Sequence, residues 1–319
     1  MDIALKYFLT VADEMNISRA AKRLYISQQC LSRHIQKLEE RYRVTLFIRR
    51  PRLTLTPAGE EMLATVRRIH ALEERLENDL ELQTGNVHGK IRIAAAQSRL
   101  KMLLSPVLPD YHRMHPNVQI EVLGNNVRDS QIKLRNGLVD MYIGVNAPLD
   151  SGCERIALCQ EGMYIVARRS VFRKYIPNYA SKAVLPTAGI HPSDIAKIPY
   201  IMAQHNSNLP GMQLLEYLEL HGVKCDFQLT TNDTELMLNL AATMDAAAYC
   251  TEMFLNTLST IQQDPNDPLL AFPLQGYSHF NTLYLVYYQD VWRPQYVRDF
   301  VDLIVAHCAD KNTNTHLPK

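Results

Sequence analysis

The sequence predicts an α+β protein of three successive parts: a small helical head, one long helix, and a larger body of alternating strands and helices. The head has helix-spaced apolar residues interrupted by turn signals, and the long helix has an apolar stripe with no interior proline. The body alternates short apolar strands with amphipathic helices, which is typical of α/β folds. With 319 residues, 47% of them apolar, the chain can bury a core in each part. The predicted boundaries are 1–60 for the head, 57–89 for the long helix and a hinge, 90–310 for the body and 311–319 for a tail.

Residues 8–47 of the head read as a helix, a second short helix, a tight turn and a third helix. Ser18 is expected to cap the short helix, and Ser27 is expected to cap the third helix. Alanine side chains on the short helix leave room for the third helix to cross it closely. The residues expected at this crossing are Ala20, Ala21, Leu31 and Ile35. The pattern predicts a helix-turn-helix.

The opposite face of the third helix carries amides, a hydroxyl and a guanidinium, which are groups that hydrogen-bond base edges in the major groove. Residues 48–56 alternate as a two-stranded wing does, with arginines at the tip that suit phosphates or the minor groove. Residues 1–60 hold 11 Lys and Arg against 6 Asp and Glu, so the head carries +5 and the rest of this +1 chain carries −4. This footprint favours DNA over an ordinary solvated helix face. The predicted DNA contacts are Ser18, Arg19, Ser27, Gln28, Gln29, Ser32, Arg33, Gln36, Arg49, Arg50 and Arg52.

The head also matches a known family, segment by segment. The matching segments are Tyr7-Phe8, Ala12, Ser18-Arg19-Ala20-Ala21, Leu24, Ile26-Ser27-Gln28, Leu31-Ser32-Arg33, Ile35, Leu38-Glu39, Leu46-Phe47, Arg49 and Leu55-Thr56-Pro57-Ala58-Gly59. Residues 1–66 thus resemble the winged helix-turn-helix of LysR-type transcriptional regulators. The family usually has Pro and Ala where this chain has Gln29 and Cys30, and Gly where it has Arg43. Gln29 gives up a helix-starting proline but adds a group that can contact a base.

Residues 57–83 are predicted to form one helix of about 40 Å at about 1.5 Å per residue, with Pro57 in its first turn. Its apolar stripe consists of Met62, Val66, Ile69, Leu72, Leu76 and Leu80. A lone helix cannot bury so narrow a stripe, so a partner helix is expected; the alternative is packing against the chain's own domain. The family resemblance implies an inter-subunit contact in a homodimer or homotetramer. Two recognition helices would then read a two-fold symmetric site on double-stranded DNA, and the resemblance also implies RNA polymerase as a partner.

The body reads as two α/β halves followed by a late strand at 281–288 and an amphipathic helix at 294–307. The other expected strands are 91–96, 118–123, 139–145, 199–202, 223–229 and 247–249, and the other expected helices are 100–115, 130–136, 211–221 and 235–244. A late strand that returns to the first half predicts a hinged, two-lobed, periplasmic-binding-protein-like domain, which is also the family's plan. The predicted lobes are about 90–166 with 282–310, and about 167–281.

The body departs from the family in two places. Where the family often has a Gly-x-Gly-Ile-Ala-x-x-Pro stretch, residues 243–250 contain neither glycine nor the proline. Residues 168–197 form a segment longer than expected, with three prolines. These departures leave open a regulator of the same build that ignores ligands.

A small anion is the expected ligand of the cleft between the lobes. Ser98 directly follows the first strand and is expected to cap the next helix, whose free N–H groups favour a carboxylate. Thr231 precedes a helix with Glu235 at a capping-box position. The resemblance implies effector contacts near these places, near residues 204–206 and near Val127; helix capping alone is the alternative for each. The predicted effector contacts are Gln97, Ser98, Asn126, Gln204, His205, Asn206 and Thr231. An organic acid or an amino acid is expected.

Other chemistry finds little support. The six cysteines show no C-x-x-C or zinc spacing, so buried reduced thiols are expected, with Cys250 as the one candidate for redox sensing. His112 and His115 share a helix end before Pro116, and no metal or cofactor is expected there. No hydrolase, phosphate-loop or zinc-protease motif occurs, and no signal-like or membrane-spanning apolar run. We expect a cytoplasmic DNA-binding regulator and not an enzyme. The rival is a small-molecule-binding α/β protein whose N-terminal module serves assembly.

Overall fold

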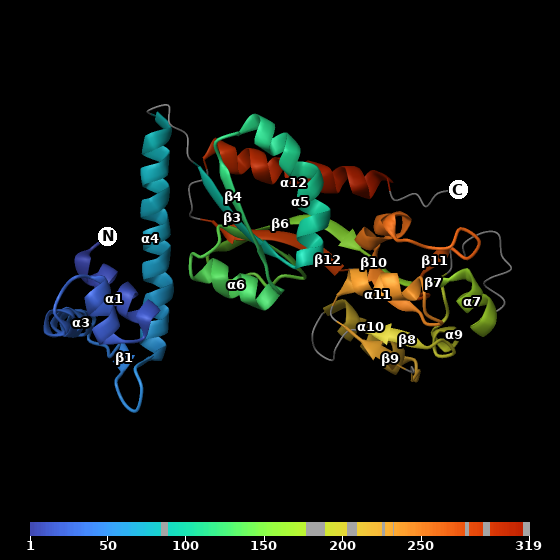
Figure 1. The fold of residues 1–319 in the computed structure, drawn as a ribbon, viewed down its shortest axis with the longest axis horizontal. Helices are drawn as coiled ribbons and strands as arrows, with labels where there is room; N and C mark the ends of the chain where they lie inside the picture. Colours follow the sequence, from blue (N-terminus) through green and yellow to red (C-terminus); the bar gives the residue numbers. More distant parts are fainter. Residues whose placement is uncertain are drawn as a thin grey trace.

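The structure, a computed structural model, describes residues 1–83, 89–176, 189–202, 209–224, 227–231, 233–277, 281–289 and 294–314 (Figure 1). The three predicted parts are confirmed: a helical head, one long helix and a two-lobed α/β body. Figure 1 shows the long helix between the head and the first lobe, with the second lobe at the far end.

The head contains three helices and a two-stranded wing. The helices are α1 (Ile3–Glu14), α2 (Ile17–Arg23) and α3 (Gln28–Tyr42), and the wing strands are β1 (Phe47–Ile48) and β2 (Thr54–Leu55). The predicted crossing of α2 and α3 is confirmed, because all four of its residues are buried in the head core. Ser27 caps α3 by accepting from the amide of Cys30 at 3.2 Å, as predicted. The cap predicted at Ser18 is wrong: α1 ends at the left-handed Met15, and Asn16 caps α2 by accepting from the amide of Arg19 at 3.0 Å.

The long helix α4 (Pro57–Gln83) divides its apolar stripe between two environments. Val66 is buried in the head core, and Met62 packs against that core. The predicted dimer role is therefore wrong for Val66, whose surface is already covered by its own domain. Ile69 and Leu72 line a cavity of about 270 Å³ against the first lobe. Leu72 nevertheless stays 46% exposed, and the last two stripe residues are 58% exposed at Leu76 and 55% at Leu80.

The first lobe is built on a five-stranded sheet with the strand order β4-β3-β5-β12-β6. Its strands are β3 (Lys90–Ala95), β4 (Gln119–Gly124), β5 (Met141–Val145), β6 (Cys153–Glu161) and β12 (Asn281–Tyr288). The predicted return of the late strand is confirmed, since β12 lies antiparallel between β5 and β6. Helices α5 (Gln97–Met114) and α12 (Gln295–Asn314) share one core with the sheet, and α6 (Val127–Arg135) packs in a second core.

The second lobe holds two small sheets, β10-β7-β11 and β8-β9. Its strands are β7 (Met163–Arg168), β8 (Tyr200–Met202), β9 (Phe227–Thr230), β10 (Ala248–Thr251) and β11 (Leu269–Pro273). Its helices are α7 (Arg169–Tyr175), α9 (Pro192–Ile195), α10 (Leu209–Leu220), α11 (Thr234–Ala241) and the 3₁₀ segment η1 (Glu252–Thr260). Strands β6, β7 and β11 were not predicted. Because β7 pairs only within the second lobe, that lobe begins at Met163, a few residues before the predicted 167.

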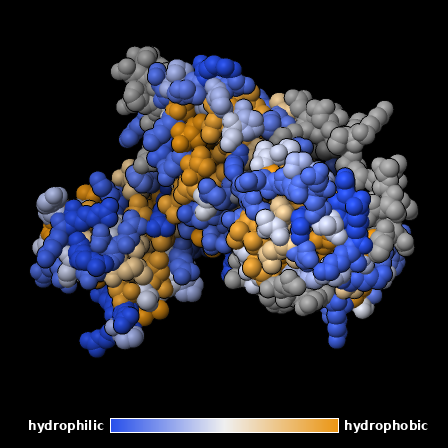
Figure 2. All heavy atoms as spheres, turned by 45° about the vertical axis from the view of Figure 1, so that its right-hand side comes forward, coloured by the Kyte–Doolittle hydropathy of each residue, from blue (hydrophilic) through white to orange (hydrophobic). Residues whose placement is uncertain are grey.

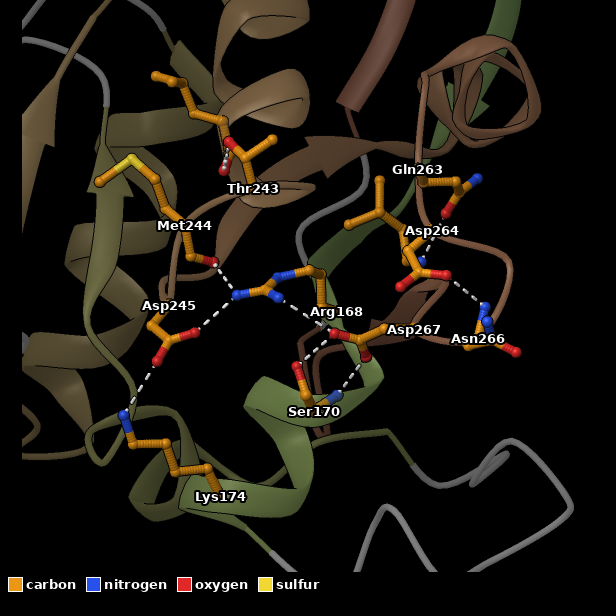
Figure 3. Close-up of polar contacts among 12 residues, drawn as sticks. Arg168, Ser170, Lys174, Thr243, Met244, Asp245, Gln263, Asp264, Asn266 and Asp267 are labelled. Carbon is orange, nitrogen blue, oxygen red and sulfur yellow. Dashed lines mark hydrogen bonds and ion pairs between the residues drawn. The ribbon is translucent and has the colours of Figure 1, made fainter.

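The atypical 243–250 segment is held by a cluster of charged side chains centred on Arg168 (Figure 3). The guanidinium of Arg168 donates to the carbonyl oxygen of Met244 at 3.2 Å and to the carboxylate of Asp245 at 2.6 Å. Its other terminal nitrogen donates to Asp267 at 3.1 Å. Lys174 on α7 donates to Asp245 at 3.0 Å. These side-chain contacts fix the turn between α11 and β10 where the family's glycines are absent.

Candidate functional site

The exposed face of α3 is polar, as predicted, while its opposite face is buried. Gln28, Gln29, Arg33 and Gln36 are exposed and Ser32 is half-buried, whereas Leu31, Ile35 and Leu38 have at most 2% of their surface exposed. The hydroxyl of Ser18 on α2 donates to the side-chain oxygen of Gln28 at 2.9 Å, so this contact orders the start of α3. Figure 2 shows that hydrophilic side chains dominate the visible face of the head.

The predicted arginines differ in their surroundings. Arg49, Arg50 and Arg52 are all exposed in the loop that joins β1 to β2. Arg19 is held by Glu14, with 3.3 Å between its Nε and the carboxylate. Within the described residues, Arg33, Arg50 and Arg52 have no ion-pair partner. These three guanidinium groups can therefore bind a partner molecule without first breaking an ion pair.

A cavity of about 840 Å³ lies between the two lobes. It is lined by the predicted residues Gln97, Ser98 and Asn126, together with Val127. Thr231 lines an adjoining cavity of about 700 Å³, which shares Gln97 and Ser98 with the first. The remaining predicted contacts, Gln204, His205 and Asn206, lie outside the described residues. The structure thus gathers the described predicted residues around one end of α5.

Helix α5 presents an uncapped N-terminus to these cavities. It begins at Gln97, one residue before the predicted cap, and no side chain accepts from its first amides. The cap predicted at Ser98 is wrong, because Ser98 lies inside the first turn. The side chain of Gln97 lies where a Cβ on Gly124 would stand, so the glycine makes room for it. Free amides and the helix dipole favour an anion at this position.

The other two helices at the cleft carry their own caps. Asn126 caps α6 by accepting from the amide of Asp129 at 2.8 Å. Asp233 caps α11 by accepting from the amides of Glu235 and Leu236, so the alternative reading of Thr231 as the cap of this helix is wrong. Thr231 instead accepts from the amide of Asp233 at 3.3 Å. The α5 N-terminus is therefore the best anion site among the three helix starts.

A buried ion pair that the sequence did not suggest lies at the floor of the cleft. Arg99 on α5 donates to Glu161 at the end of β6 at 2.6 Å, and to the hydroxyl of Thr251 on β10 at 3.0 Å. The side chain of Arg99 is 7% exposed and that of Glu161 is 2% exposed. Arg99 lies on the same buried face of α5 as Leu103 and Val107. A charged residue within this apolar stripe is the sequence signal that could have predicted a buried ion pair.

The cysteines of the described part of the chain are all free. Cys250 is buried and lines the cleft. Burial, followed by the charge of Glu161, raises the pKa of its thiol well above the usual value. A thiol in this state is a poor nucleophile at neutral pH, which favours the structural role over redox sensing.

A winged helix-turn-helix with a polar recognition face, joined to a two-lobed domain with an interlobe cavity, defines the class of DNA-binding regulators with a ligand-binding domain. The chain belongs to the LysR family of transcriptional regulators. The family model described as "LysR substrate binding domain" matches residues 84–309, and the one described as "Bacterial regulatory helix-turn-helix protein, lysR family" matches residues 3–60.

Curated relatives match mainly in part. The chain is 31% identical to the uncharacterized regulator YkuM of Bacillus subtilis, over 37% of this chain and 41% of YkuM. It is 31% identical to the transcriptional regulator IlvY of Escherichia coli, over 44% of this chain and 47% of IlvY. It is 24% identical to ArgP of Aeromonas salmonicida, over 77% of this chain and 80% of ArgP. The chain spans less than half the length of the first two relatives.

Solved structures share the fold along nearly the whole chain. ArgP from Mycobacterium tuberculosis has a TM-score of 0.68 at 18% identity, covering 96% of both chains. A full-length OxyR variant from Pseudomonas aeruginosa has a TM-score of 0.67 at 18% identity, covering 94% of this chain and 93% of OxyR. Full-length CbnR complexed with its target DNA has a TM-score of 0.59 at 20% identity, covering 96% of this chain and 99% of CbnR. None of the helices in the described part combines the length and apolar character needed to cross a bilayer.

Proposed function

We propose that this chain is a sequence-specific regulator that binds a two-fold symmetric site on double-stranded DNA as a homodimer or homotetramer. A small anionic effector in the interlobe cavity controls it, and RNA polymerase is its proposed protein partner. We expect it to act in the cytoplasm, on the DNA that it binds. The observation that carries the proposal is α3, whose polar face is exposed beside an arginine-rich wing while its apolar face is buried.

The head supplies both kinds of DNA contact. Arg33 is suited to read guanine because a guanidinium can donate two hydrogen bonds to its major-groove edge. Gln29 and Gln36 present amides on the same face, although Gln36 donates to Glu40 at 3.1 Å in the unbound chain. Arg50 and Arg52 on the wing contribute charge that acts on any sequence. The α3 face therefore carries specificity and the wing carries affinity.

The exposed part of the α4 stripe supports the proposed oligomer. Leu72, Leu76 and Leu80 repeat every four residues and stay about half exposed in the single chain. Covering the exposed half of each leucine with a second copy of α4 is worth about 0.7–1.5 kcal/mol. A dimer with two α3 helices then accounts for a two-fold symmetric DNA site.

The cleft supports an anionic effector. The uncapped start of α5 offers free amides to the cavity, and the charged residues that line the cavity in the described part of the chain are Arg99 and Arg128. Binding at this place touches both lobes, because residues of α5, α6, α10 and β10 all line the cavity. An effector that binds one arrangement of the lobes better shifts the population toward it.

Genome-wide footprinting of the purified chain tests the proposal. We expect a two-fold symmetric motif in which Arg33→Ala relaxes the base preference at one position of each half-site. Arg41→Ala is the matched control, because Arg41 lies on the same helix but pairs with Asp2 at 3.1 Å. Motif-free binding by the intact chain, with and without cell extract metabolites, would contradict the proposal and favour the rival in which the head serves assembly.

A ligand-independent regulator of the same build remains the second candidate, favoured by the atypical 243–250 segment. A thermal-shift screen with organic acids and amino acids separates the two, because a ligand that binds the folded state raises the melting temperature.

A further inference from the structure

Among the residues that the structure describes, the walls of the interlobe cavity carry positive charge and apolar surface but no negative charge. Among the described lining residues, the charged side chains are those of Arg99 and Arg128, and none is acidic. Apolar walls come from both lobes, with Val127, Ile143 and Val145 on one side and Met212, Tyr249 and Phe254 on the other.

Arg99 lines the cavity, and its guanidinium is held in a buried ion pair behind the cavity wall. Arg99, Thr251 and Phe254 line the cavity together, whereas Glu161 does not. The guanidinium carbon lies 5.3 Å from the centre of the Phe254 ring, and its nitrogens bond Glu161 and Thr251. The pair is therefore a dipole with its positive end at the cavity and its negative end behind it. The start of α5 adds a second positive dipole end at the same place.

The Arg99–Glu161 pair is not arranged for stability alone. One carboxylate oxygen of Glu161 accepts from Arg99, Thr251 and the amide of Met253. The other oxygen is buried with no hydrogen-bond partner in the described part of the chain. A buried carboxylate with an unsatisfied oxygen costs stability. We infer that the buried Glu161 carboxylate is retained because it holds the guanidinium of Arg99 beside the cleft.

Acidic side chains at the rim are already committed to other partners. Asp233 in the adjoining cavity accepts from two amides at the start of α11. Both oxygens of Glu235 accept from Lys101, at 2.9 and 3.0 Å. An ammonium group that entered the cleft would lose its hydration and find no carboxylate to replace it.

We propose that Arg99 is the specificity-determining residue of the cleft and that the effector is a carboxylate on an apolar body, without an ammonium group. This rests on the proposed function, since it names the ligand class of the same cavity. The sequence analysis expected either an organic acid or an amino acid as the effector. The charges on the cavity walls favour an organic acid without an ammonium group over an amino acid.

Matched ligand sets test this in the full-length protein by isothermal titration calorimetry. One set is 4-methylpentanoate, its amide and leucine; the other is 3-phenylpropanoate, its amide and phenylalanine. We expect the acid of at least one set to bind about tenfold or more tighter than its amide and its amino acid. The positive ends of the Arg99–Glu161 pair and of α5 attract a carboxylate, whereas the amide has no charge and the amino acid brings an ammonium group with no carboxylate to pair with. Equal binding within both sets, or no binding by either acid, would overturn the proposal.

Variants then locate the preference. Arg99→Gln combined with Glu161→Gln removes both charges without leaving a lone buried carboxylate, and we expect it to abolish the preference for the acid. Arg99→Lys keeps the positive charge, so it should retain part of the preference for the acid. Arg113→Gln is the control, because Arg113 lies on the same helix, is exposed and pairs with Asp110 far from the cavity. Loss of the preference in the Arg113 variant, or its survival in the double variant, would contradict the role of Arg99.

The footprint keeps this proposal separate from the proposed function. If an amide or an amino acid binds and alters operator binding, the regulator stands and the acid assignment falls. If the intact chain shows no operator motif, the proposed function falls whatever the calorimetry shows.

Discussion

The guanidinium carbon of Arg68 on α4 lies 5.2 Å from the centre of the Tyr288 ring at the end of β12. Beside this contact, Gly137 has a φ of +65°, and a Cβ on it would lie 3.0 Å from the carbonyl oxygen of Arg67. The glycine thus lets the backbone of α4 lie against the first lobe. The DNA-binding part and the cleft-bearing part are therefore in direct contact as well as joined by the chain.

We expect Gly137→Ala to loosen this contact. Any alanine at positive φ costs about 1–2 kcal/mol, and here the added methyl also meets the α4 backbone. Gly222→Ala is the matched control, since Gly222 has a φ of +67° with nothing within 4 Å of the added Cβ. Hydrogen exchange should speed up in α4 around residues 65–72 in the first variant only. Unchanged exchange there would show that the contact does not hold α4.

Arg33→Ala and Arg52→Ala should weaken DNA binding in different ways. Loss of a bidentate base contact at Arg33 is expected to cost about 1–3 kcal/mol and to relax specificity at one operator position. Loss of the wing charge at Arg52 should weaken binding to all sequences and reduce the slope of log K against log salt by about 1. Titrations against a set of operator variants at several salt concentrations measure both. Equal loss on every variant would rule out base reading by Arg33.

Leu76→Glu should separate the proposed dimer. Leu76 is already partly covered in the single chain, so each protomer loses about 0.7–1.5 kcal/mol of apolar burial and the dissociation constant should rise by at least about tenfold. Leu220→Glu is the control, because Leu220 is 73% exposed on the second lobe, away from α4. Sedimentation velocity gives the oligomeric state, and an unchanged dimer in the Leu76 variant would move the interface elsewhere.

Acid should remove the stabilising effect of Asp267. Burial raises the pKa of this carboxyl, but the hydrogen bonds from Ser170 and the guanidinium of Arg168 outweigh it and hold the pKa below its usual value. A depressed pKa in the folded state means that the contribution is complete above the unfolded-state pKa of about 3.9 and fades as pH falls below it. Asp267→Asn should therefore destabilise the chain at pH 7.

The difference between Asp267→Asn and the parent should shrink toward the lowest pH at which the parent stays folded. Urea unfolding followed by fluorescence at pH 7, 5 and 3.5 measures it. A difference that is constant across these pH values would mean that the charge of Asp267 does not matter for stability.

The sequence predicted elements well where local pattern decides the structure. The α3 face and the β12 strand at 281–288 have strong periodicity, and both lie where it places them. Strand β6 was missed because Glu154, Arg155 and Glu161 interrupt its apolar pattern, and its place is set by pairing with β12, which is 120 or more residues away. Long-range pairing of this kind leaves little local signal.

The candidate site was predicted in outline and not in detail. Ser18, Ser98 and Thr231 all stand within a few residues of a helix start, but the helix boundaries shifted by one or two residues and moved the capping role to other positions. Sequence alone cannot choose between neighbouring Asn, Ser, Thr and Asp, because all of them can cap. Arg99 was missed for a different reason: its partners Glu161 and Thr251 come from distant strands.

The central position of β12 in the first sheet sets the order in which the chain can fold during synthesis. Strands β5 and β6 have no ladder between them until residues 281–288 arrive, about nine-tenths of the way along the chain. The head and the second lobe pair their strands from nearer segments and can fold first as units. The lobe that contacts α4 is thus the last to close, so a nascent chain truncated before residue 281 would carry a finished DNA reader on an open sheet.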